Sequence, residues 1–127
     1  MARMIAGTDY AEQFVIPRPA GEKKSRNYKT VGTTVYETVC EYTVTDGQVF
    51  HLTKITASAK EDFWLKLSFA GEDVSIEYYV AGGVPFTDWF PWGWNPCEGD
   101  GAKKVELLAK GETVVTTVFA EIAGEEV

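Results

Sequence analysis

The residues best suited to chemistry in this sequence are aromatic side chains that lie between prolines in residues 85–96. The aromatic members are Phe86, Trp89, Phe90, Trp92 and Trp94, and the prolines are Pro85, Pro91 and Pro96. Proline fixes φ and lacks a backbone N–H, so we expect a loop here, and neither a helix nor a central strand. Flat aromatic faces can stack on sugar rings, anchor a contact with another subunit or partner, or pack on their own domain. The sequence leaves these three uses open.

Catalytic and metal-binding patterns are missing from the sequence. A single histidine, His51, leaves no base for a Ser/His/Asp arrangement, and one histidine with two distant cysteines does not make a zinc site. Asp88 with Glu98 or Asp100 could flank a sugar near the tryptophans, but the glycines around Glu98 and Asp100 favour a tight turn. We therefore predict that the protein is not an enzyme and holds no cofactor and no metal.

The rest of the chain is dominated by short segments that alternate apolar and polar residues, which is typical of β-strands. We expect strands at residues 33–44, 49–57, 63–69, 74–80, 103–109 and 113–122, with a β-bulge near Thr53. The pairs 63–69/74–80 and 103–109/113–122 are each expected to form a hairpin. Six or seven strands and no helix predict an all-β, two-sheet antiparallel sandwich that is jelly-roll-like, with an open barrel as the second choice.

The two cysteines fall in different surroundings within this pattern. Cys40 lies on a predicted inward face of a strand, and Cys97 lies in a predicted loop. Because the sequence starts without an export signal, we favour two free thiols over a disulfide.

Charge and breaker residues divide the single expected domain into an N-terminal arm, residues 1–30, and a sandwich, residues 31–127. Residues 1–29 carry a net charge of +3, and residues 30–127 carry −10, which together give the total of −7. A basic arm on an acidic body is suited to docking on an acidic protein surface, although an ordinary solvated terminus remains the alternative. The candidate arm contacts are Arg3, Phe14, Ile16, Arg18, Lys23, Lys24 and Arg26.

The same charge and hydropathy limit the expected partners and location. An acidic body repels nucleic acid and anionic membranes, and no apolar run approaches about 20 residues. The first residues lack the apolar core of a secretory signal. We therefore expect no nucleic-acid or membrane partner, and a protein made in the cytoplasm that leaves the cell, if at all, by lysis or assembly.

A breaker-rich arm followed by the strand sequences of residues 47–55, 65–72 and 120–127 resembles the small structural proteins of tailed phages and related viruses. This resemblance is to head decoration (cement) proteins and to the jelly-roll heads of fibres. It implies a non-enzymatic virion protein that is assembled in the host cytoplasm, forms homotrimers, and binds the major capsid protein or another virion protein. The alternative function is a carbohydrate-binding or receptor-binding module that uses the aromatic residues of 85–96.

Overall fold

The computed structural model describes residues 22–70 and 72–127, and this part of the chain consists of strands and turns without a helix. The strands are β1 (Glu22–Val31), β2 (Glu37–Thr43), β3 (Val49–Ala59), β4 (Phe63–Phe69), β5 (Glu72–Val80), β6 (Phe86–Trp89), β7 (Cys97–Glu98), β8 (Lys104–Gly111) and β9 (Thr116–Glu126). The described residues contain no helix that is long and apolar enough to span a membrane.

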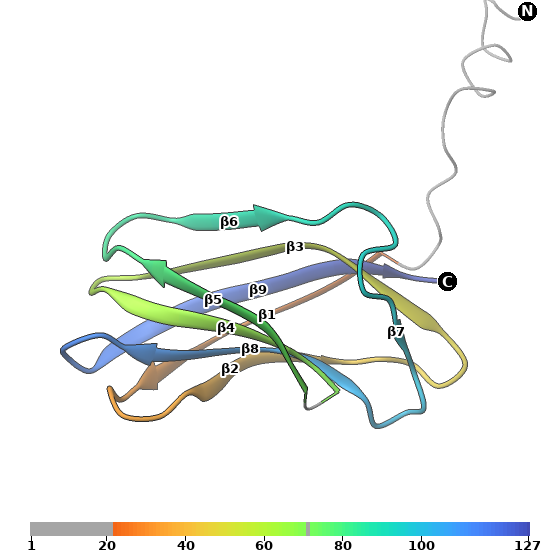
Figure 1. Cartoon of the computed structure of the whole chain (residues 1–127), viewed down its shortest axis with the longest axis horizontal. Helices are drawn as coiled ribbons and strands as arrows, with labels where there is room; N and C mark the ends of the chain where they lie inside the picture. The colour runs from red at the N-terminus through yellow and green to blue at the C-terminus, as the bar shows by residue number, and fades with distance from the viewer. Residues whose placement is uncertain (1–21, 71) are drawn as a thin grey trace, which may run out of the picture.

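The strands form two antiparallel sheets that pack face to face (Figure 1). Sheet A has the order β1-β9-β3-β6, with β7 added to β3, and sheet B has the order β2-β8-β4-β5. With the short β7 set aside, the first strand pairs with the last, and the second with the second-last. The third pairs with the third-last (β3 with β6), and the two central strands, β4 and β5, pair with each other. A long hairpin rolled up in this way is a jelly roll, so the predicted fold class is confirmed.

Alternation along most of each strand builds the core between the sheets. In β4, Phe63, Leu65 and Leu67 are fully buried, whereas Trp64 and Lys66 lie on the outer face, as the sequence predicts. The pairing of β3 with β9 shifts register between Leu52 and Lys54, which confirms the predicted bulge near Thr53. The extra residue lets Leu52 and Ile55 both point into the core despite their odd spacing.

The N-terminal boundary of the domain differs from the prediction. Residues 22–30, assigned to the arm from their charges, belong to β1, a strand of ten residues that pairs with β9 along its whole length. Cross-strand pairing overrides the weak strand propensity of this lysine-rich stretch. The remainder of the predicted arm, including Arg3, Phe14, Ile16 and Arg18, lies outside the described residues.

Two other strand predictions need correction. The predicted hairpin of 103–109 with 113–122 is wrong, because β8 lies in sheet B and β9 in sheet A, so the turn between them carries the chain from one sheet to the other. The hairpin of β4 with β5 is confirmed. Residues 85–96 are also not entirely irregular, since β6 forms an edge strand between Pro85 and Pro91, where a missing N–H can face solvent.

The acidic residues near the C-terminus form part of the sandwich. Glu126 is the last residue of β9 and is only 7% exposed. Its carboxylate accepts hydrogen bonds from Tyr42 Oη at 2.5 Å and from the Thr45 backbone N–H and hydroxyl, each at 2.9 Å. This residue therefore ties the end of sheet A to the β2–β3 connection of sheet B.

Candidate binding surface

The aromatic residues of 85–96 divide into an inner and an outer set, through alternation along β6 and through the connection that follows this strand. Strand β6 pairs with residues 54–57 of β3, and this register places Phe86 toward the core and Trp89 toward solvent. Phe86 and Phe90 are half-buried and pack against the core, as does Trp94. The sequence-predicted site is thus split between the two faces of sheet A.

The inner set closes one end of the sandwich. Phe90 and Trp94 stack with ring centroids 4.6 Å apart, and Trp94 also meets the edge of Phe69 of sheet B at 6.0 Å. The Trp94 backbone N–H donates to Pro91 O at 3.0 Å, so the turn is fixed by its own backbone. Phe86, Phe90 and Trp94 therefore act as packing residues that join this segment to the core between the sheets.

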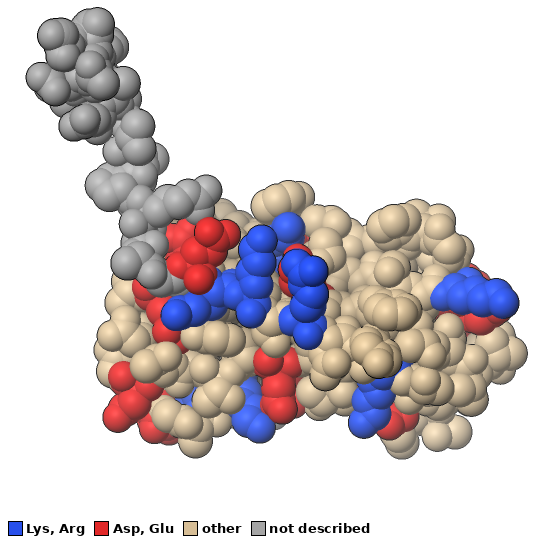
Figure 2. Space-filling view, turned by 180° about the vertical axis from the view of Figure 1, so that it is seen from behind, with Lys and Arg blue, Asp and Glu red and all other residues tan. Residues whose placement is uncertain are grey.

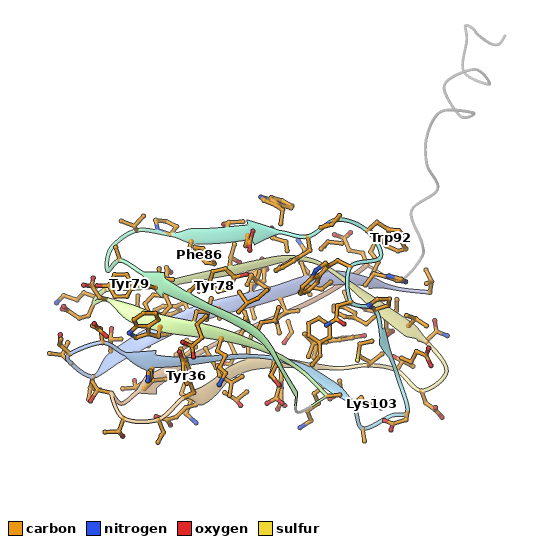
Figure 3. All side chains as sticks on the ribbon, in the orientation of Figure 1. Tyr36, Tyr78, Tyr79, Phe86, Trp92 and Lys103 are labelled. Carbon is orange, nitrogen blue, oxygen red and sulfur yellow. The ribbon has the colours of Figure 1, made fainter. Side chains whose placement is uncertain are left out.

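The edges of the two sheets are joined beside β6. Tyr78 of β5 and Phe86 of β6 lie side by side with centroids 4.8 Å apart (Figure 3), and the Tyr78 hydroxyl donates to Asp88 Oδ2 at 2.7 Å. Burial, together with this bond to a carboxylate, raises the pKa of Tyr78 far above its ordinary value. Asp88 therefore serves as a structural acceptor in this geometry. It lies opposite Ile55 of β3, whereas Glu98 lies opposite Val49, six residues or about 20 Å away along the same strand, which is too far for the two to flank one sugar.

The outer set consists of two exposed tryptophans, each supported by one neighbour. Trp89 is 69% exposed and lies under Lys54 Nζ, which is 5.2 Å from its ring centroid. Trp92 is 56% exposed and stacks on His51 at 4.1 Å. The Nδ1 atom of His51 is buried and has no hydrogen-bond partner. These tryptophans offer flat apolar area to a ligand or partner.

The turn around Glu98 and Asp100 has a structural explanation. Asp100 Oδ1 accepts hydrogen bonds from the backbone N–H groups of Ala102 and Lys103, both at 2.9 Å. These two bonds lower the pKa of Asp100 below its ordinary value. The carboxylate is thus used to hold the turn, as the sequence predicts.

Both cysteines are free and buried. Cys40 lies on the inner face of β2, as predicted, but Cys97 lies in β7 paired with Phe50 and not in an irregular loop. Burial raises the pKa of Cys40 to about 12 and also raises that of Cys97. Neutral, enclosed thiols of this kind are poor nucleophiles.

The outer face of sheet A contains a second feature, a groove of about 600 Å³. It is lined by residues 26–28 of β1, 119–121 of β9 and 56–58 of β3, and by Pro85 and Phe86. Because Asn27 and Ala57 both lie opposite Ala120 in the sheet, the groove runs across the strands. Tyr28 and Phe119 form one side of it, with ring centroids 5.4 Å apart, and they are 63% and 53% exposed.

Charge on this face is unevenly spread. Figure 2 shows Lys, Arg, Asp and Glu side chains gathered over one half, whereas uncharged residues cover most of the other half. Of the predicted arm contacts, Lys23, Lys24 and Arg26 lie in β1. Arg26 Nη2 pairs with Glu121 Oε2 at 3.0 Å, and Lys54 Nζ lies 3.8 Å from the other oxygen of that carboxylate. The two cations beside the groove therefore share one carboxylate, which leaves a single excess positive charge.

The groove is the part of the surface that sequence reasoning missed. Phe119 alternates with the buried Val118 and Ala120, so its outward direction could have been predicted from the strand pattern. Tyr28 carried no such signal, because Thr30 is the single β-branched residue in the charged stretch 22–30.

Within residues 22–70 and 72–127, no group of three or more His, Cys, Asp and Glu side chains could hold a metal ion. No model of a known protein family matches the chain, and no curated protein matches it either.

Proposed function

We propose that this chain is a non-enzymatic structural protein of a virus particle, a decoration protein that binds the capsid surface and stabilises the shell. The observation that carries this proposal is the outer face of sheet A, where the exposed Tyr28 and Phe119 flank a groove whose two charged lining residues, Arg26 and Glu121, pair with each other. Exposed aromatic side chains around a depression are typical of surfaces that are buried by a partner.

The fold supports the virion part of the proposal by analogy. Jelly rolls with this strand pairing occur in viral capsid domains and also in lectins and cupins, so the fold is compatible with several functions. The rolled sandwich has long strands joined by tight turns such as the one at Asp100, which gives a rigid surface for assembly. The proposed partners are the major capsid protein and further copies of this chain, in a homotrimer.

The test uses particles from a genome in which the gene for this chain is deleted. Purified chain is added to these particles, and they are separated on a density gradient. We expect the chain to migrate with the particles and to raise the temperature at which they release their contents. A Tyr28→Ser/Phe119→Ser variant should bind with lower occupancy, whereas Val115→Ser, an exposed residue in the β8–β9 turn, should bind normally. A chain that stays at the top of the gradient would contradict the proposal.

A carbohydrate-binding module is the second candidate, and the exposure of Trp89 and Trp92 favours it. Each indole leaves one face open while the other contacts a neighbour, Lys54 or His51. Tryptophan fluorescence measured during titration with a glycan panel tests this function. A saturable change that disappears in Trp92→Ala would support it, and a flat response across the panel would end it.

A further inference from the structure

We propose that the groove on the outer face of sheet A binds residues 14–19 of a second copy of this chain. The inference rests on the proposed assembly function and specifies one of its contacts, the one between copies. The groove consists of residues from β1, β9, β3 and β6, so each copy would present a complete acceptor site.

The dimensions of the groove fit an extended segment of about this length. Crossing from β1 to β6 means crossing three strand spacings of about 4.8 Å, or about 14 Å in all. Residues 14–19 have the sequence Phe-Val-Ile-Pro-Arg-Pro, in which two prolines favour extended backbone. At about 3.1 Å per residue, six residues in such a conformation span about 18 Å.

The chemistry of the groove favours an apolar, proline-containing occupant. Tyr28 and Phe119 form one side of the groove. Proline-rich segments commonly dock on aromatic surfaces because they lose little entropy on binding. The two charged residues in the lining, Arg26 and Glu121, are paired with each other at 3.0 Å. The lining therefore offers no excess charge that would favour a strongly charged ligand, and residues 14–19 carry a single charge, Arg18.

The tether favours a second copy over the same chain. Pro19 is three residues from Glu22 and can lie at most about 10 Å from it. The groove begins at Arg26, about 13 Å along β1 from Glu22. If the chain reversed at residues 20–21, the segment would run along β1, but the groove crosses the strands. In the same chain Pro19 would therefore fall short of the groove, whereas a segment from another copy has no such restriction.

The experiment uses the full-length chain and three variants. The arm variant is Phe14→Ser/Ile16→Ser, the groove variant is Tyr28→Ser/Phe119→Ser, and Val115→Ser is the exposed control. Light scattering across a concentration series reports association. Circular dichroism and thermal unfolding check that each variant is folded. A fluorescent peptide of residues 12–20, titrated with the arm variant and followed by anisotropy, reports binding to the groove directly.

We expect the wild type and Val115→Ser to associate, and the arm and groove variants to be monomeric over the same range. Mixing the two variants should restore association in part, because one copy then supplies an intact segment and the other an intact groove. The peptide should bind the arm variant. Its affinity should fall at least about tenfold for a chain that carries Tyr28→Ser and Phe119→Ser in addition to the arm substitutions.

Three results would overturn the inference. They are a groove variant that associates like the wild type, a peptide that binds equally well without the aromatic pair, and a wild type that stays monomeric at every concentration. A monomeric wild type whose arm variant still binds the peptide would assign the groove to the segment of the same chain. All of these measurements use purified chain without particles. If purified chain shows neither self-association nor peptide binding but still binds particles normally, the contact between copies is refuted and the proposed function still stands.

Discussion

Glu126 provides the sharpest prediction about stability. Its carboxylate is almost fully buried and accepts hydrogen bonds from Tyr42 and Thr45 that join the two sheets. Burial alone would raise its pKa, but these hydrogen bonds outweigh burial and hold the pKa below the ordinary value of 4.5. A group whose pKa is lower in the folded state stabilises that state above its unfolded pKa, and this contribution disappears as the pH falls through the folded pKa.

The magnitude follows from the bonds that Glu126→Gln would change. A glutamine keeps the shape and can accept two of the three hydrogen bonds, but it loses the charge that strengthens them. Hydrogen bonds to charged groups contribute about 1.5–3 kcal/mol and neutral ones about 0.5–1.5 kcal/mol, so we expect a loss of about 1–2 kcal/mol at pH 6. Glu126→Ala removes every acceptor and leaves the Thr45 N–H unpaired, and it should cost about 3 kcal/mol or more.

Urea unfolding of the wild type and Glu126→Gln at pH 6 and at pH 3 measures this difference. The gap in free energy of unfolding between the two proteins should shrink at pH 3, because the stability contributed by a carboxylate with a lowered pKa declines as the pH falls below the ordinary value of 4.5. Tyr42→Phe in both backgrounds completes a double-mutant cycle, and we expect a coupling of about 1 kcal/mol at pH 6. A gap that is the same at both pH values, or a coupling near zero, would refute this account of Glu126.

Two further predictions concern the core. A Cβ at Gly124 would lie 2.4 Å from Phe50 Cζ, so Gly124→Ala should lower the free energy of unfolding by roughly 1–3 kcal/mol in urea titrations. Gly32→Ala, where a Cβ meets no atom within 4 Å, is the control and should change it by less. Cys40 and Cys97 should resist a thiol reagent at pH 8 in the folded protein and react only after denaturation, because burial raises both pKa values. Rapid reaction of either thiol under native conditions would contradict this placement.

Much of the fold could be predicted from local sequence patterns, because alternation reports directly which side of a strand is buried. The alternation in residues 63–69 predicts β4 with the bounds that the structure shows, and the parity change between Leu52 and Ile55 predicts the bulge in β3. Pairing between distant strands was harder to predict, because a turn signal does not say whether the next strand joins the same sheet or crosses to the other. The connection from β8 to β9 shows this, since it resembles a hairpin turn and yet joins different sheets.

The candidate site was predicted in part. The prolines and tryptophans marked residues 85–96 as unusual, but composition alone could not separate the inward Phe90 and Trp94 from the outward Trp89 and Trp92. For Trp89 that placement depends on the register of β6 against β3, and for Phe90, Trp92 and Trp94 it depends on the connection that follows β6. The groove depends on residues from four strands that are far apart in sequence, so it becomes visible only when the sheet order is known.

The central claim is that the outer face of sheet A is the surface this chain uses in assembly, and side-chain footprinting tests it most directly. Hydroxyl-radical labelling of Tyr28 and Phe119 is compared between dilute purified chain and chain bound to particles, with Tyr79 of sheet B as the exposed reference. We expect Tyr28 and Phe119 to become protected on particles, and Tyr79 to keep its reactivity. Unchanged labelling of Tyr28 and Phe119 in the bound chain would contradict it.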